Sequence, residues 1–147
     1  MKRLPGVLAG IIIVITALFL VNSLPSAKMV ITEEEMEQSR SEAGGVIIRQ
    51  LQLNKGGILE VELYAHWSAG MKWSATFDNT GIMRHADARR FTYAGPPMTV
   101  GGPGHENWKF EAVKEGNATV TMTYNSVANL PDAPFKVNTV VIQIKVG

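Results

Sequence analysis

Strict alternation of apolar and charged side chains in residues 59–63, within the segment 57–65, GILEVELYA, constrains the fold of this chain more than any other feature. In an extended segment Leu59, Val61 and Leu63 face one way, while Glu60 and Glu62 face the other. A period of two is typical of a strand with one buried and one solvated face. The strand runs into a short polar-aromatic loop that closes on Gly70, as expected for a binding loop held between two strands.

The same period recurs through the rest of the chain, separated by turn signals at residues 55–57, 78–81 and 114–117. The Gly- and Pro-rich stretch 94–104 must be a loop, because proline cannot donate to a strand ladder. About seven short strands without a helical pattern predict an all-β domain over residues 46–147, an immunoglobulin-like antiparallel β-sandwich. The candidate strands are residues 46–50, 59–63, 71–77, 89–93, 107–112, 118–124 and 140–146.

An uncharged apolar run, residues 4–21, follows Lys2 and Arg3 at the N-terminus. This layout predicts a hydrophobic helix within residues 1–27 that is either a signal peptide or a membrane anchor. Ser26-Ala27 is an acceptable cleavage site, and both interpretations stay open. In either case the basic residues remain inside and the remainder is exported. The expected location is extracytoplasmic, anchored to the cell membrane or secreted after cleavage.

Residues 28–45 are rich in glutamate and connect the apolar run to the predicted domain. Thr32 and the glutamates after it have the character of a capping box, which can start a short helix. We favour a solvated acidic linker, ended by Gly44-Gly45.

Composition excludes several classes of function. The absence of cysteine rules out a disulfide framework and thiol catalysis, and a net charge of +1 gives no reason to expect a nucleic-acid partner. No Ser/His/Asp arrangement or carboxylate pair is present, so we expect no catalytic residue, no cofactor and no enzyme. His66 and His105, with His85 or Glu106, could hold a metal, but ligand spacing is absent and none is expected.

Two loop motifs carry a family resemblance. Gly70 and Trp73, with Ser68 in the place of threonine, are similar to the Asn-Pro-Thr-Thr-Gly and aromatic-x-Trp signature of the chagasin family of cysteine peptidase inhibitors. The leading Asn-Pro is replaced by His66-Trp67. The run 101–104, Gly-Gly-Pro-Gly, resembles the family's Gly-x-Gly-Gly, with Pro103 in the place of one glycine. The hairpin and threonine-rich strand at 114–124 also look like the family, and the resemblance covers residues 46–147.

The third family signature, Arg-Pro-Trp, falls on Ser126-Val127-Ala128 and is lost. The resemblance implies that three loops at one end of the sandwich wedge into the active-site cleft of a papain-like cysteine peptidase. Together with the N-terminal apolar run it predicts an exported inhibitor, tethered to the membrane if this segment is retained, and we expect a monomer. The implied contact residues are His66, Trp67, Ser68, Ala69, Gly70, Gly101, Gly102, Pro103, Gly104, His105, Ser126, Val127 and Ala128.

Other interpretations of the same residues remain open. The chain can instead be a cell-surface binding or adhesion module that kept the fold and lost protease inhibition, or a purely structural domain on a stalk. Trp67 is either an interface anchor or a lid folded over the end of the sandwich, whereas Trp73 and Trp108 are expected in the core. Asn117-Ala118-Thr119 is a possible glycosylation site at Asn117, although turn chemistry explains it equally.

Overall fold

The computed structural model describes residues 15–17, 24–96, 101–126 and 138–147. Its elements are the strands β1 (Ile15–Ala17) and β2 (Leu24–Ile31), the helix α2 (Glu33–Glu42), the long strand β3 (Val46–Ala65), the single 3-10 turn η1 (Trp67–Ala69), and the strands β4 (Met71–Phe77), β5 (Met83–Tyr93), β6 (Gly104–Ala112), β7 (Gly116–Ser126) and β8 (Asn138–Val146).

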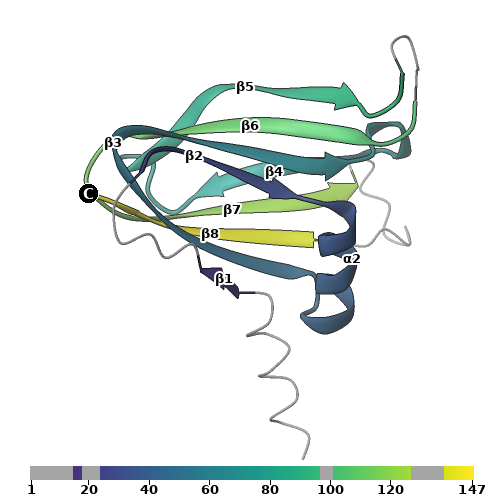
Figure 1. Ribbon diagram of the computed structural model, residues 1–147, viewed down its shortest axis with the longest axis horizontal. Helices are drawn as coiled ribbons and strands as arrows, with labels where there is room; N and C mark the ends of the chain where they lie inside the picture. Colours follow the sequence, from purple (N-terminus) through teal and green to yellow (C-terminus); the bar gives the residue numbers. More distant parts are fainter. Residues whose placement is uncertain (1–14, 18–23, 97–100, 127–137) are drawn as a thin grey trace, which may run out of the picture.

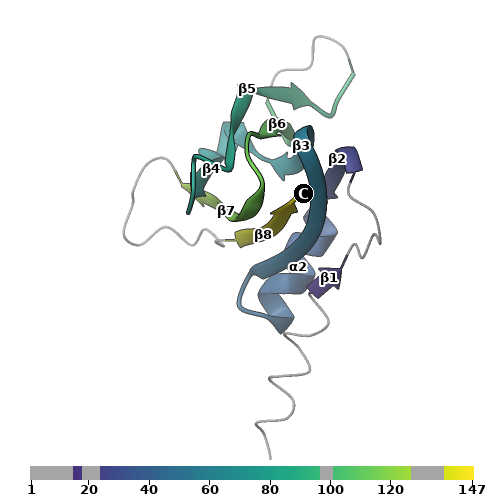
Figure 2. The same ribbon diagram turned by 90° about the vertical axis from the view of Figure 1, so that its left-hand side faces the viewer.

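Strand β3 is 20 residues long and belongs to both halves of the sheet. Residues 46–53 pair in parallel with β8, and residues 58–65 pair antiparallel with β6. The strand order is β4-β7-β8-β3-β6-β5, and Figure 2 shows β3 as the strongly curved ribbon that joins the two halves. The bend lies at Gly56, with φ of 84°, and Gly57, where a Cβ would lie 2.8 Å from the carbonyl oxygen of Asn54.

Alternation along the strands builds the core, as the sequence predicts. In β6, β7 and β8 every second residue is buried, and these inward side chains meet those of β3. Trp73 and Trp108 lie in this core, as expected. The all-β class is confirmed. The sheet is not purely antiparallel, however, because β1, β2 and β8 each pair with β3 in parallel.

The prediction that residues 28–45 form a solvated acidic linker is wrong. Strand β2 pairs with the second half of β3, and Met29 and Ile31 are buried in the core. The helix that the capping box allowed does form, because the Thr32 side chain accepts a hydrogen bond from the Glu35 backbone N–H (3.2 Å) and caps α2. Met36, only 1% exposed, packs from this helix into the same core.

Polar contacts fix α2 to the start of β8. The fully buried Asn138 side chain donates to the carbonyl of Met36 (3.1 Å), to the Ser39 hydroxyl (2.9 Å) and to the carbonyl of Gly45 (3.3 Å). Arg40 donates in turn to the Asn138 side-chain oxygen. The segment from β2 to α2 is therefore an integral layer of the fold (Figure 1).

The predicted N-terminal helix falls mostly outside the described residues. Within residues 1–27, Ile15–Ala17 forms strand β1 beside residues 48–50, and residues 24–27 belong to strand β2, so a helix is wrong for these positions. Among the residues that the structure describes, no helix has the length and apolar character needed to cross a membrane. Export, cleavage and anchoring stay predictions.

Replacing Met36 by alanine tests whether α2 belongs to the fold. We expect Met36→Ala to lower the free energy of unfolding by about 2–5 kcal/mol, because a buried side chain leaves a cavity. Glu37→Ala, on the exposed side of the same helix, serves as the control and should change it by about 0.5 kcal/mol or less. Urea denaturation measures both, and equal small effects would show that α2 does not pack on the sandwich.

Candidate functional site

The ends of β3 and β7 and the starts of β4 and β6 lie at the same end of the sandwich, at the right of Figure 1. Ala65 at the end of β3 lies opposite Gly104 at the start of β6, and Met71 at the start of β4 lies opposite Ser126 at the end of β7. The first loop (residues 66–70), the second loop (residues 94–103, described at 94–96 and 101–103) and Ser126 at the end of β7 are therefore neighbours. Val127 and Ala128, predicted as contact residues of a third loop, lie outside the described residues.

The first loop is a compact turn held at both ends. The backbone N–H of His66 donates to the phenol oxygen of Tyr124 (2.9 Å), and the N–H of Gly70 donates to the carbonyl of Trp67 (2.9 Å). Gly70 has φ of 75°, a left-handed conformation that strains other residues. Burial raises the pKa of Tyr124 to about 12, so this phenol stays uncharged at neutral pH.

The first and second loops are bonded to each other. The N–H of Gly102 donates to the hydroxyl of Ser68 (2.9 Å), and Gly101 and Gly102 both have left-handed φ, of 88° and 86°. Gly104 has a different role, since a Cβ there would lie 2.0 Å from the carbonyl oxygen of Thr92. Glycine at 104 permits β5 and β6 to approach closely, while the glycines at 101 and 102 shape the loop.

A buried carboxylate, Glu106, lies beneath the two loops. It is 0% exposed, and its Oε2 accepts from the indole Nε1 of Trp67 (2.8 Å) and the backbone N–H of Trp73 (2.9 Å). Its Oε1 accepts from the indole Nε1 of Trp108 (3.0 Å). These donors come from η1, β4 and β6, so one side chain ties the first loop to two strands.

Arg89 covers this carboxylate from β5. Its guanidinium donates to the carbonyl oxygen of Trp73 (2.7 Å) and lies 3.9 Å from Glu106 Oε1. It also lies over the rings of Trp67 and Trp108, 5.5 and 5.7 Å from their centroids. A cation therefore compensates the buried charge.

Trp67 folds back over the end of the sandwich, as the lid interpretation predicts. Its half-buried indole is hydrogen-bonded to Glu106 and stacked on Phe91, with ring centroids 4.6 Å apart and planes at 19°. The Lys72 ammonium lies 4.4 Å from the ring centroid. Trp67 thus fixes the position of the first loop, and its exposed portion is presented by a rigid support.

The other sequence candidates are placed less favourably for chemistry. His105 lies in β6 between Tyr64 and Thr92, and its Nδ1 is buried without a hydrogen-bond partner among the described residues. His85 packs beside the Trp108 ring instead of joining His66. Within the described ranges no group of three or more His, Asp or Glu side chains could hold a metal ion. Asn117 is exposed but lies within β7, opposite Lys145, and not in the predicted turn.

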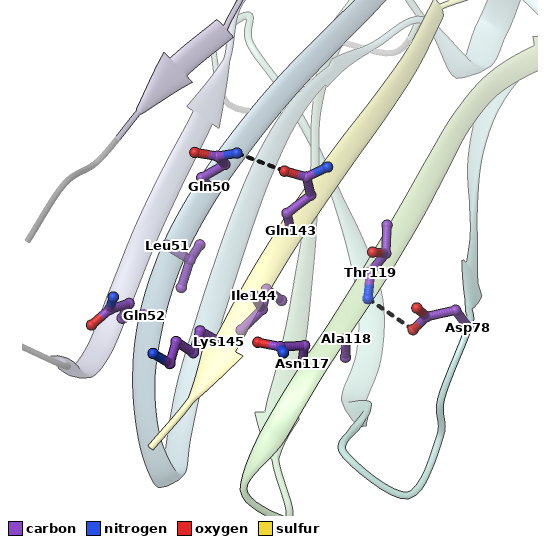
Figure 3. A pocket seen from close by; sticks show the side chains of 10 residues that line it. All are labelled: Gln50, Leu51, Gln52, Asp78, Asn117, Ala118, Thr119, Gln143, Ile144 and Lys145. Carbon is purple, nitrogen blue, oxygen red and sulfur yellow. Dashed lines mark hydrogen bonds between the residues drawn. The ribbon is translucent and has the colours of Figure 1, made fainter.

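A polar depression of about 380 Å³ lies on the outer face of β3, β8 and β7, toward the end opposite the loops (Figure 3). Within it the Gln50 side chain donates to the Gln143 side chain (2.7 Å), and the Asp78 carboxylate accepts from the Thr119 backbone N–H (2.8 Å). The residues lining it include no histidine and no pair of carboxylates. Nothing in this depression provides a nucleophile with its base.

Glutamine at position 106 tests the role of the buried carboxylate. Glu106→Gln turns one acceptor oxygen into a donor that faces other N–H groups. We expect the free energy of unfolding to fall by about 1–3 kcal/mol. Glu111→Gln, the same change on β6 at a partly exposed ion pair with Arg84, should cost about 0–1 kcal/mol. Urea unfolding followed by tryptophan fluorescence compares them, and equal losses would contradict a special role for Glu106.

Solved structures resemble the chain in fold. The cysteine protease inhibitor EhICP2 from Entamoeba histolytica aligns with a TM-score of 0.54 at 17% identity, covering 82% of this chain and 97% of the inhibitor. Amebosin, known from a solution structure, aligns with a TM-score of 0.55 at 16% identity, covering 82% of this chain and 98% of amebosin. A search of curated protein sequences gives no match.

A family model gives the stronger result. The model of the chagasin family of peptidase inhibitors, I42, matches residues 52–142, more than half of the 147 residues. The match includes the first loop, the glycines of the second loop and Glu106. The chain therefore belongs to the chagasin family of peptidase inhibitors.

Proposed function

We propose that this protein inhibits papain-like cysteine peptidases by placing its loop end in the active-site cleft. Family membership supports this proposal, and so does the geometry that carries it: two loops bonded to each other through Ser68 and Gly102 and fixed from below by Glu106. The inhibitor supplies shape and no chemistry. A peptidase is blocked because substrate and loops compete for one cleft.

Rigidity is what makes such a mechanism effective. Ordering a flexible loop on binding costs free energy, and a loop that is already fixed avoids much of that cost. The first loop has its N-terminal end bonded to Tyr124, its indole bonded to Glu106 and its C-terminal end closed by Gly70. The first loop is therefore formed before the peptidase arrives.

Two departures from the family pattern affect how strongly the protein is expected to inhibit a peptidase. His66-Trp67 occupies the place of Asn-Pro, and the Trp67 indole is used internally. Ser126-Val127-Ala128 occupies the place of Arg-Pro-Trp and offers no large aromatic or charged side chain to the peptidase. Inhibition should therefore be weaker than for a family member that keeps all three signatures.

Titration against papain tests the proposal. We expect competitive inhibition of papain on a fluorogenic peptide substrate, with an unchanged kcat and a KM that rises with inhibitor concentration. Trypsin, a serine peptidase with a different cleft, is the control and should be unaffected. No inhibition of papain at high micromolar concentration would reject the proposal and favour the interpretation of a binding module with another partner.

A matched pair of tryptophan variants tests whether the fixed position of the loop matters. Trp67→Phe and Trp108→Phe each remove one indole donor to Glu106, but only Trp67 belongs to the loop. We expect Trp67→Phe to raise the inhibition constant about tenfold, equivalent to about 1.4 kcal/mol, and Trp108→Phe to leave it within about threefold. Unfolding measurements on both variants correct for stability. Equal inhibition constants would mean that the indole bond does not position the loop.

A further inference from the structure

Three aromatic rings form a continuous row from β5 to the first loop. Tyr93 meets Phe91 edge to face, with centroids 4.9 Å apart and planes at 89°, and Phe91 stacks on Trp67 at 4.6 Å. We call Trp67, Phe91 and Tyr93 the aromatic row. Residues 89–93 were expected only as a strand, because Phe91 and Tyr93 belong to no loop motif.

The row ends at the mouth of the second loop. In the β5–β6 ladder Tyr93 lies opposite Gly104, and the N–H of Ala94 donates to the carbonyl of Pro103 (3.1 Å). A Cβ at position 104 would lie 2.9 Å from Cζ of Phe91, so glycine at 104 leaves room for the middle ring. The row therefore joins both loops that contact the peptidase in the proposed function.

Tyr93 is 38% exposed, and in the described part of the chain only Val30 is a comparably exposed large hydrophobic residue. One end of the aromatic row is buried and the other is exposed. Phe91 packs against the core, while the Tyr93 side chain is exposed to solvent. A tyrosine held in this way offers apolar area and a hydroxyl at small entropic cost, and aromatic side chains are enriched among the residues that dominate interfaces.

We propose that the aromatic row is a further contact with the same peptidase, made by Tyr93 against an apolar wall beside the active-site cleft. This inference rests on the proposed function and extends its contact surface from loops to strand β5. The aromatic row adjoins the first and second loops, so a peptidase that receives these loops must pass beside Tyr93. This position identifies the peptidase as the partner of the row. The wall it meets should be apolar, with a hydrogen-bonding group for the phenol.

Variants at position 93 test this inference against a papain-like peptidase that the unmodified protein inhibits. We expect Tyr93→Ala to raise the inhibition constant about 10- to 30-fold, and Tyr93→Phe, which keeps the ring, to stay within about threefold. Val30→Ala, at the other exposed apolar residue, is the control and should match the unmodified protein. Melting temperatures should agree within a few degrees, because Tyr93 lies at the end of its strand.

The outcomes separate the two proposals. If the unmodified protein inhibits and Tyr93→Ala inhibits equally well, the aromatic row is not a contact, while the proposed function stands. If the unmodified protein inhibits no papain-like peptidase, the proposed function fails first. Should Tyr93→Ala lower the melting temperature, Tyr93→p-benzoylphenylalanine decides: a photo-cross-link to the peptidase supports the contact, and its absence overturns it. Self-association that is lost in Tyr93→Ala would also overturn it, in favour of a second copy.

Discussion

The loop end of this protein depends on one buried carboxylate. A charge removed from water is costly unless hydrogen bonds and an opposite charge compensate it. Glu106 satisfies this requirement with two indole N–H groups, one backbone N–H and the nearby guanidinium of Arg89. Since the donors come from a loop and two strands, the carboxylate is satisfied only when all of them are in place. The cost of burying Glu106 thereby specifies a single arrangement of the loop end.

Strand β3 connects the loop end to the rest of the molecule. Its first half pairs with β8 and its second half with β6, so both halves of the sheet share one backbone. Strand β2 pairs with the second half of β3 on the edge that β6 leaves open, and Asn138 joins helix α2 to β8. The loops project from a scaffold that includes this N-terminal layer, which explains why a boundary at residue 46 would cut through the core.

The sequence predicted features that depend on neighbouring residues, and it did not predict those that depend on contacts between distant segments. Alternation in residues 57–65 and 118–124 correctly gave strands and their inward faces, because periodicity is local. The layer formed by β2 and α2 was missed. The glutamates of residues 33–37 indicated a solvated segment, although Met29, Ile31 and Met36 are apolar. Parallel pairing of β3 with β8 could not be predicted, because it joins segments about 90 residues apart.

The candidate site shows the same division. The glycines of the two loops were identified from a resemblance, and the structure brings them together through Ser68 and Gly102. Glu106 was considered only as a possible metal ligand and its buried role was missed, although the alternation of Trp108 and Phe110, extended back by two residues, already places it on the inward face. A charged residue on the buried face of a strand was the available signal. Two of the donors to Glu106 come from η1 and β4, and no local pattern indicates such distant donors.

Hydrogen–deuterium exchange of the protein alone and with papain tests the central claim most directly, namely that a preformed loop end makes the contact. Rigid loops that insert into the cleft should show slowed exchange on binding at the amides of residues 66–70 and 101–105, with no change along β3, β7 and β8 around the polar depression of Figure 3. Protection at Gln50, Thr119 and Gln143 with unprotected loops, or no protection anywhere at saturating papain, would contradict this account.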